Sequence, residues 1–488
     1  GSGGGSGSGG GGGSSSAASS GVSGVSQTVV QGDPSTSPLS YPAGIAIDQA
    51  GNLYLADAST NIVQKVTTAN AVSTFVGTSG VAGMKDGSRF DVLFNQPGAC
   101  AVDGSANIFV ADTGNATIRK VTADGVVTVF AGTASNRGNR DGTGPGAWFS
   151  SPGGIAVDGS GNLYVADSFN ATIRKITTAQ VVSTLAGSAG VRGEADGPGS
   201  AARFNFPTGM AVDAAGNVYV ADTYNHTIRK ITPAGTVSTL AGSAGISGGF
   251  DGTGINALFN QPVGLAVDSS GNVLVADTGN ATIRRITPGG VVNTLAGMAG
   301  IAGLRDGAGA TALFNQPRGL VPGSSGSIYV ADTGNAAIRK VAADGTVTTL
   351  ALSVTLSFGA PSGLSATAVS TTGIDLHWTD NAGNEQGFQI ERSAANASSF
   401  AQIATVAFNT VSFSDTGLTT GTTYDYRVRA YNGTGTTAYS NTASATPSSA
   451  AASGSSGGES SYGGGAMEGW FAILLALLTM AQWMARRP

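Results

Sequence analysis

Apolar and polar residues alternate in short blocks along most of this 488-residue chain, and the blocks return with a period of 55 residues. In one copy, residues 154–157 and 162–166 are almost continuously apolar, whereas residues 173–177 and 181–186 mix apolar with polar positions. Short apolar runs bounded by Gly, Asp and Asn are typical of strands, and a continuous run indicates a strand covered on both faces. Each copy therefore predicts four short antiparallel strands, two buried and two more exposed to water.

The period is clearest at one aspartate. It occurs six times, each time 55 residues after the last, at Asp57, Asp112, Asp167, Asp222, Asp277 and Asp332. A fixed period of this length is the signature of an array of identical supersecondary units. Four antiparallel strands repeated six times predict an all-β fold, a six-bladed β-propeller over residues 27–354.

One run of residues carries a family resemblance. Residues 217–230 read Asn-Val-Tyr-Val-Ala-Asp-Thr-Tyr-Asn-His-Thr-Ile-Arg-Lys, and the run recurs in variant form in every copy. It resembles the NHL repeat, which implies a propeller. The first and last copies depart from the pattern, with Gln64 in place of Arg and with Pro322-Gly323 in place of Val-Asp. We therefore expect an irregular ring closure, with residues 27–31 as an extra edge strand.

Symmetry argues that the repeated polar residues are structural, because a catalytic site is normally asymmetric. We expect the Asp57 series to accept hydrogen bonds from turn N–H groups and to form charge-assisted pairs with a second series, Arg119, Arg174, Arg229, Arg284 and Arg339. A further Asp-Gly series, which begins at Asp86, precedes a repeated Phe in each connection between copies. We interpret it as a capped turn anchored by Phe, and the alternative is a set of calcium sites. Cys100 occupies an apolar position and predicts a buried thiol.

The connections between copies hold the extra length of this array. Strand alternation places them on one face together with the turns between second and third strands. Because loops on a rigid scaffold commonly carry binding residues, this face is the predicted ligand-binding face. The candidate residues on it are Arg137, Arg140, Trp148, Arg192, Glu194, Tyr224, His226, Phe250 and Arg305.

Charge and composition limit the chemistry. The net charge is −5 and no long basic run is present, which argues against nucleic acid as a partner. With only His226 and His377 in the chain, a three-His zinc site is excluded, and no catalytic residue or cofactor is predicted, calcium being left open. The leading hypothesis is a surface-displayed scaffold that binds an extracellular protein or glycan. The alternatives are a calcium-dependent, lactonase-like hydrolase acting in the central channel and a structural component of an envelope assembly.

The 55-residue period stops before residue 355, where a second pattern begins. Residues 355–447 form alternating strands at the spacing of a β-sandwich and resemble a fibronectin type III domain. The resemblance implies that Trp378 is a core residue and that the Tyr424 hydroxyl bonds the backbone near Leu418.

Low-complexity segments flank the two domains. Residues 1–26 and 448–465 are rich in Gly and Ser and predict flexible tethers. Residues 466–488 hold a short apolar run, expected to be helical, that ends in Arg486-Arg487. With the glycines before it, this segment resembles a GlyGly-type C-terminal sorting signal read by an envelope protease. A plain membrane anchor is the alternative, and both imply a bacterial protein exported to the cell surface.

Overall fold

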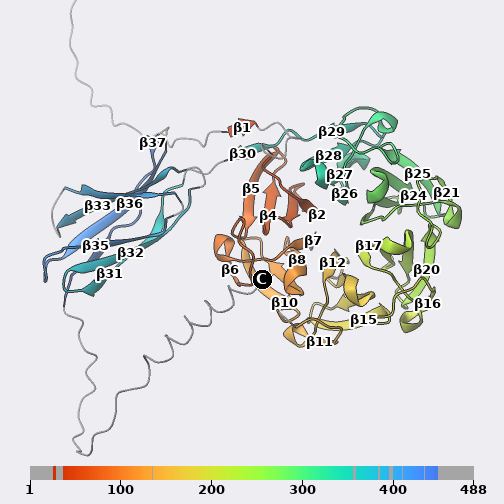
Figure 1. The fold of residues 1–488 in the computed structure, drawn as a ribbon, viewed down its shortest axis with the longest axis horizontal. Coiled ribbons are helices and arrows are strands. Elements are labelled where there is room, and N and C mark those ends of the chain that lie inside the picture. Colours follow the sequence, from red (N-terminus) through yellow and green to blue (C-terminus); the bar gives the residue numbers. More distant parts are fainter. Residues whose placement is uncertain are drawn as a thin grey trace, which may run out of the picture. The chain divides into compact units, whose positions relative to one another are not determined.

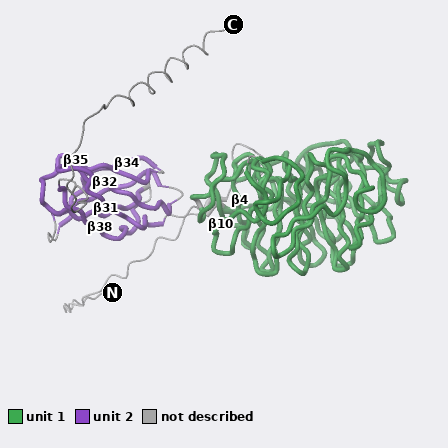
Figure 2. The backbone as a smooth tube through the Cα atoms, turned by 90° about the horizontal axis from the view of Figure 1, so that it is seen from below, with its two compact units in different colours: residues 1–357 green, residues 358–488 purple. Residues whose placement is uncertain are grey.

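The computed structural model describes residues 26–28, 37–134, 136–355, 359–382, 385–394, 399–408, 410–432 and 435–448. These residues form strands, turns and three-residue 3₁₀ segments, so the prediction of an all-β fold is confirmed. The chain divides into two compact units, residues 1–357 and 358–488 (Figure 2). No helix among the described residues is long and apolar enough to cross a membrane. The proposed sorting segment, 466–488, lies outside the described residues, as do nearly all of both tethers.

The first unit is a ring of sheets that follow one another around a common centre (Figure 1), numbered one to six in chain order. Sheet three shows the plan: β12 (Pro152–Val157), β13 (Leu163–Asp167), β14 (Thr172–Ile176) and β15 (Val181–Gly187) pair in sequence, all antiparallel. The short strand β11 (Gly142–Thr143), which belongs to the preceding connection, adds to the outer edge of β15.

The other sheets repeat this plan with small variations. Their strands are β2 (Pro42–Ile47), β3 (Leu53–Asp57), β4 (Ile62–Val66) and β5 (Ala71–Val76); β6 (Gly87–Ser88), β7 (Pro97–Val102), β8 (Ile108–Asp112), β9 (Thr117–Val121) and β10 (Val126–Ala131); β16 (Gly197–Pro198), β17 (Pro207–Val212), β18 (Val218–Asp222), β19 (Thr227–Ile231) and β20 (Thr236–Ala241); β21 (Gly252–Thr253), β22 (Gly264–Val267), β23 (Val273–Asp277), β24 (Thr282–Ile286) and β25 (Val291–Ala296); and β26 (Pro317–Pro322), β27 (Ile328–Asp332), β28 (Ala337–Val341) and β29 (Val347–Thr349).

The hydrophobic core lies between neighbouring sheets rather than at the centre of the ring. Between sheets two and three, Phe149 of the connection is fully buried against Ile118 of β9 and Ile176 of β14. The equivalent Phe94, Phe204, Phe259 and Phe314 are fully buried in the same way. The prediction that a repeated Phe anchors each connection between sheets is therefore confirmed.

The ring closes with strands from both ends of the array. After sheet six the chain forms β30 (Ser353–Thr355), which pairs parallel to β5 of sheet one, and β1 (Ser26–Thr28) pairs antiparallel to β30. The extra edge strand predicted for residues 27–31 thus starts one residue earlier, while residues 29–31 lie outside the described part. Pro322 is accommodated because it ends β26, which is an edge strand of its sheet.

One hydrogen bond joins most neighbouring sheets near the centre of the ring. The hydroxyl of Thr333, in the turn after β27, donates to the carbonyl of Pro42 at 2.6 Å and so links sheet six to sheet one. The same bond is made by Thr113, Ser168, Thr223 and Thr278 to the first proline of the following sheet. Ala58 stands at this position in sheet one and has no hydroxyl to donate.

The second unit is a sandwich of two sheets. One contains β31 (Ser362–Ser370), β32 (Gly373–Thr379) and β35 (Ser412–Thr416), and the other contains β33 (Gly387–Ala394), β34 (Ala401–Ala407), β36 (Tyr424–Asn432), β37 (Gly435–Thr436) and β38 (Ala443–Ala445). Trp378 and Leu418 are buried between them. The Tyr424 hydroxyl accepts the N–H of Thr419 at 3.2 Å, the backbone bond that the resemblance implied.

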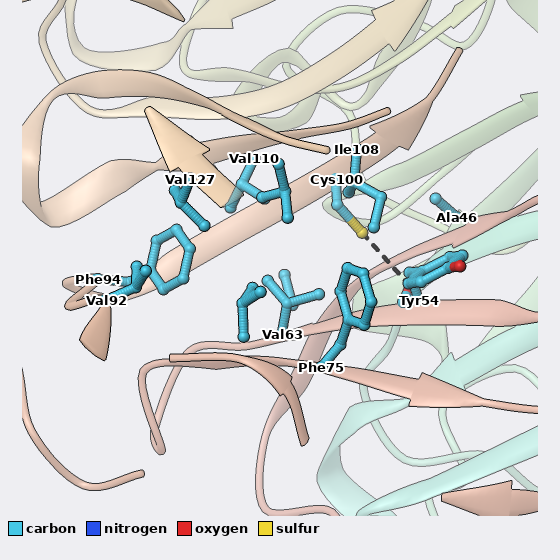
Figure 3. Close-up of a cluster of buried hydrophobic side chains, with 13 residues drawn as sticks. Ala46, Tyr54, Val63, Phe75, Val92, Phe94, Cys100, Ile108, Val110 and Val127 are labelled. Carbon is cyan, nitrogen blue, oxygen red and sulfur yellow. Dashed lines mark hydrogen bonds between the residues drawn. The ribbon is translucent and has the colours of Figure 1, made fainter. Parts of the chain in front are cut away.

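Cys100 lies in the cluster between sheets one and two (Figure 3) and is buried as predicted. Its thiol donates to the carbonyl oxygen of Tyr54 at 3.3 Å. Burial raises the pKa of the Cys100 thiol to about 12.

A thiol reagent at pH 8 should therefore label Cys100 in the native chain on the order of a thousandfold more slowly than in the chain in denaturant. Stoichiometric labelling of native protein within minutes would contradict this placement.

Candidate functional site

Each of sheets two to six contains one buried arginine that binds two aspartates. In sheet three, Arg174 binds Asp167 at 3.0 Å through Nη1 and Asp141 at 2.6 Å through Nη2. The same two nitrogens donate to the carbonyls of Trp148 and Arg140 at 2.9 and 3.0 Å. The guanidinium group also lies over the ring of Phe149, 5.1 Å from its centroid. Every terminal nitrogen is thus used within the scaffold.

The predicted pairing of the Asp57 series with arginine is present at Arg119, Arg174, Arg229, Arg284 and Arg339. Each of these aspartates accepts a backbone N–H from the connection before the first strand, for example Ser150 on Asp167, and a side-chain N–H from the asparagine in the turn that follows it, for example Asn170 on Asp167 at 2.7 Å. In sheet one, which has Gln64 instead of arginine, Asp57 does accept N–H groups of its own turn, from Ser59 and Thr60.

The buried aspartates are electrostatically constrained. Burial raises the pKa of Asp222 to about 6, while the Asn205 N–H and the charge of Arg229 act in the opposite direction. Such a carboxyl group needs its arginine to remain charged in the interior. The series therefore belongs to the scaffold and is not free to take part in chemistry on a ligand.

The Asp-Gly turns do not fit calcium. Asp141 Oδ1 binds Arg174 and the Thr184 hydroxyl, and Oδ2 accepts the Thr184 N–H at 3.0 Å. Calcium requires six to eight oxygen ligands, whereas this carboxylate already faces a guanidinium cation. Among the described residues, no group of three or more His, Cys, Asp or Glu side chains is placed to hold a metal.

The central channel is narrow and is lined mainly by backbone and small apolar residues of the first strands. Its cavity is about 70 Å³, and its lining includes Gly44, Gly154, Gly209 and Gly264. A Cβ atom on Gly154 would lie 1.8 Å from the carbonyl oxygen of Thr208, so glycine is required at this close approach. The described lining holds no carboxylate, and its one charged residue is Arg318, so calcium does not fit the channel either.

The channel opens into a wider mouth of about 440 Å³ on the face that carries the turns between second and third strands. The mouth is lined by Tyr41, Ala43, Ala58, Ser59, Gln96, Gly98, Thr113, Ser151, Gly153, Ser168, Phe206, Thr208, Val263 and Arg318. It is larger than the cavity of the channel itself, and its lining departs from the repeat. We take it as the candidate site.

Phe206 lines the mouth and belongs to an aromatic cluster with Phe169 and Tyr224. Phe206 is stacked on Tyr224 with ring centroids 4.8 Å apart, and Phe169 meets Phe206 edge-on at 5.5 Å. Phe169 and Tyr224 are about half exposed, at 51% and 46%. The Phe206 backbone has φ of 56°, a conformation unusual for a bulky residue. These rings break the symmetry, because Gln96, Gln261 and Gln316 stand where Phe206 does in other copies.

A single cation forms another side of the mouth. Arg318 is half-buried, its guanidinium lies 5.2 Å from the ring centroid of Tyr41, and its Nε is buried without a hydrogen-bond partner. Within the part of the chain that the structure describes, no ion pair involves Arg318. The other copies have Ala43, Gly98, Gly153, Thr208 and Val263 at this position.

Two of the predicted ligand-face residues lie at or beside the mouth. Tyr224 reaches it through its stacking on Phe206. The Nδ1 atom of His226 accepts the N–H of Gln261 at 3.0 Å, and burial lowers the pKa of His226. The side chain of His226 is half-buried because its turn lies against the next connection.

The other seven lie on the connections and do not line the mouth. Arg137 donates to the Gly114 carbonyl, Arg140 lies over the ring of Trp148, and Arg305 donates to the Thr311 carbonyl. Arg192, Glu194 and Phe250 are exposed, Phe250 at 72%.

The prediction that the connections share one face is wrong in part. Arg137 does contact a turn of that face. The chain then runs along the outer edge of the next sheet as β11, and the Gly144 N–H bonds Gln180 in the turn between third and fourth strands, on the opposite face. Pairing of β11 with β15 draws the connection down this edge.

The residues that line the mouth were not predicted from the sequence. The signal that could have found them is the set of positions where the copies differ.

Comparisons with known proteins agree with this architecture. Residues 359–446 match the fibronectin type III domain family, and residues 149–176, 204–231 and 259–286 match the NHL repeat family. The chain therefore contains NHL repeats and a fibronectin type III domain, and its first unit is a propeller.

Two curated relatives and one solved structure illustrate the range of similarity. NHL repeat-containing protein 2 of Bos taurus is 32% identical over 289 residues, covering 51% of this chain and 39% of that protein. Protein SUPPRESSOR OF QUENCHING 1, chloroplastic, of Arabidopsis thaliana is 27% identical over 324 residues, covering 52% and 31%. This chain thus spans about a third of these relatives. A structural genomics protein of unknown function from Bacteroides thetaiotaomicron aligns with a TM-score of 0.50 at 23% identity, covering 65% of this chain and 71% of that one, and it shows the fold alone.

Replacement of a buried arginine should destabilise the propeller. Arg174→Gln copies the residue of sheet one but leaves Asp167 and Asp141 without their cation. We expect a loss of about 3–5 kcal/mol in the free energy of unfolding, measured by urea denaturation of the full chain. The control Arg285→Gln, on the outer part of β24, should change it by less than about 0.5 kcal/mol. Equal effects of the two substitutions would contradict the bridging role.

His226 should make stability depend on pH. Its folded pKa lies below its ordinary value of 6.5, so its contribution is fully present above pH 6.5 and is lost as the pH falls towards the folded pKa. Removal of the Gln261 bond by His226→Ala, the residue of four other copies, should cost about 1 kcal/mol at pH 8. This difference from wild type should shrink as the pH falls below 6.5. A difference that stays constant from pH 8 to pH 5 would contradict the role of a neutral imidazole.

Proposed function

We propose that this chain is an exported, non-enzymatic binding protein whose six-bladed propeller binds an extracellular glycan at the channel mouth. The observation that carries the proposal is the asymmetry of the mouth: the stacked pair Phe206 and Tyr224 and the unpaired Arg318 occupy positions that are small or amide-bearing in most other copies. Binding sites in proteins are concave, largely apolar, and carry a few polar groups that orient the ligand.

The lining suits a sugar. Aromatic rings offer flat apolar surfaces, and hydroxyl and amide groups on the same rim can bond sugar hydroxyls. The hydroxyls of Thr113 and Ser168 donate to backbone carbonyls and thus keep their lone pairs as acceptors. Gln96 supplies an amide beside them.

The remaining parts of the proposal concern display. The fibronectin type III domain would act as a spacer, and the C-terminal segment would direct the protein to a bacterial cell surface, either as a sorting signal or as an anchor. This part rests on the sequence of residues 466–488. The lactonase-like alternative loses support, because the described lining of the channel contains no carboxylate that could bind calcium.

The site assignment is tested by substitution at the mouth. A panel of neutral and acidic oligosaccharides is screened against the full chain, and the affinity of the best ligand is measured by calorimetry. Three other sheets have glutamine at this position, also with positive φ, so Phe206→Gln should leave the backbone unchanged. We expect this substitution to weaken binding about tenfold or more. Ile255→Gln, an exposed apolar residue on a connection, is the matched control and should bind as wild type.

Other outcomes identify the alternatives. Loss of binding in Phe250→Gln but not in Phe206→Gln would move the site to the connections. Failure to bind any glycan, together with self-association at low micromolar concentration, would favour the structural role in an envelope assembly.

A further inference from the structure

The charge of the residues that line the mouth of the channel favours an anionic ligand over a cationic one. Of the described residues that line it, Arg318 alone is charged, and none is acidic. This contrasts with the chain as a whole, whose net charge is −5. A single positive charge in a cavity whose lining holds no carboxylate favours the binding of an anion, because no lining residue carries a negative charge that would repel it.

The guanidinium of Arg318 is held in place but not neutralised. It lies over the ring of Tyr41, 5.2 Å from the centroid, and the buried Nε of Arg318 has no hydrogen-bond partner, as is also true of the Nε atoms of the five scaffold arginines. The five other arginines buried in this propeller each bind two aspartates. Arg318 therefore retains the planar set of donors that binds a carboxylate through two parallel hydrogen bonds.

The cation and the aromatic cluster belong to different parts of the rim. Tyr41 and Arg318 come from sheets one and six, which are neighbours across the ring closure, whereas Phe206 comes from sheet four, opposite sheet one in the ring (Figure 1). A ligand that satisfies both must present an apolar ring face at one end and an anionic group at the other. It must also fit a cavity of about 440 Å³.

We infer that the mouth selects acidic glycans, with the carboxylate of a uronic acid bound by Arg318 and a neighbouring sugar ring stacked on Phe206. This inference rests on the proposed function and specifies its ligand class. Carbohydrate is favoured over an acidic peptide because the rim combines aromatic faces with hydroxyl and amide groups and provides a single cation, which fits one carboxylate per bound unit.

The test uses the full chain and a matched pair of probes, tetragalacturonate and its fully methyl-esterified form, which differ in the charge of the carboxyl groups. Calorimetry should give an affinity for the acid about tenfold or more above that for the ester. Arg318→Gln should remove this preference by weakening only the acid. Arg285→Gln, an arginine away from the mouth, is the control and should retain the preference.

Each contrary outcome has a defined meaning. Equal binding of acid and ester, with both lost in Phe206→Gln, would overturn the inference and leave the proposed glycan site intact. An unchanged preference in Arg318→Gln would also overturn it. Binding of an oligoglutamate peptide with no binding of tetragalacturonate would replace the sugar by an acidic peptide. Absence of any glycan binding in the panel would instead contradict the proposed function itself.

Discussion

The propeller depends on one buried interaction, an arginine that joins two aspartates and stacks on a phenylalanine. In sheet three, Arg174 connects Asp167 at the end of β13 to Asp141 in the incoming connection, and its ring partner Phe149 fills the space between sheets. A buried charge is costly unless it is fully paired and hydrogen-bonded. Both terminal nitrogens of Arg174 meet this condition, whereas its Nε is buried without a partner. This single side chain thus ties together the strand, the connection and the core between sheets. The same group therefore fixes the path of the connection and the position of the next sheet.

Close packing at the centre adds a second constraint. The first strands approach so closely that Gly154 and Gly209 have backbone atoms of the next sheet where a Cβ would lie. Hydroxyl bonds such as Thr333 to Pro42 join most sheets at the same radius and continue across the ring closure. The channel is thus filled largely by backbone, and side chains can vary freely only where the first strands begin. That constraint is why the candidate site was sought at the mouth rather than inside the channel.

Much of this was predictable from the sequence because period and alternation are local properties. The run 162–166 becomes β13 (Leu163–Asp167), and 181–186 becomes β15 (Val181–Gly187). Pairing of Arg174 with Asp167 was predicted as well. Its second partner Asp141 lies 33 residues away in a loop, and no local pattern indicates how a loop folds back along a sheet edge. The path of β11 and the half-buried state of His226 depend on the same tertiary contacts. The mouth was missed because it is made from single positions in several sheets, each unremarkable alone.

Symmetry itself directs the search for function in such a scaffold. A residue found in every copy meets a requirement that every copy shares, and the Asp and Arg series show that here the requirement is folding. Positions that face solvent at the mouth are released from this requirement, so their residues can differ from copy to copy. Arg318 is the sharpest case, since Ala, Gly, Thr and Val fill its place elsewhere without disturbing the strand. Arg318 has no acidic partner among the described residues, whereas the five scaffold arginines, whose Nε atoms are also unpartnered, each bind two aspartates. For this reason Arg318 is central to the proposed recognition of an anionic ligand.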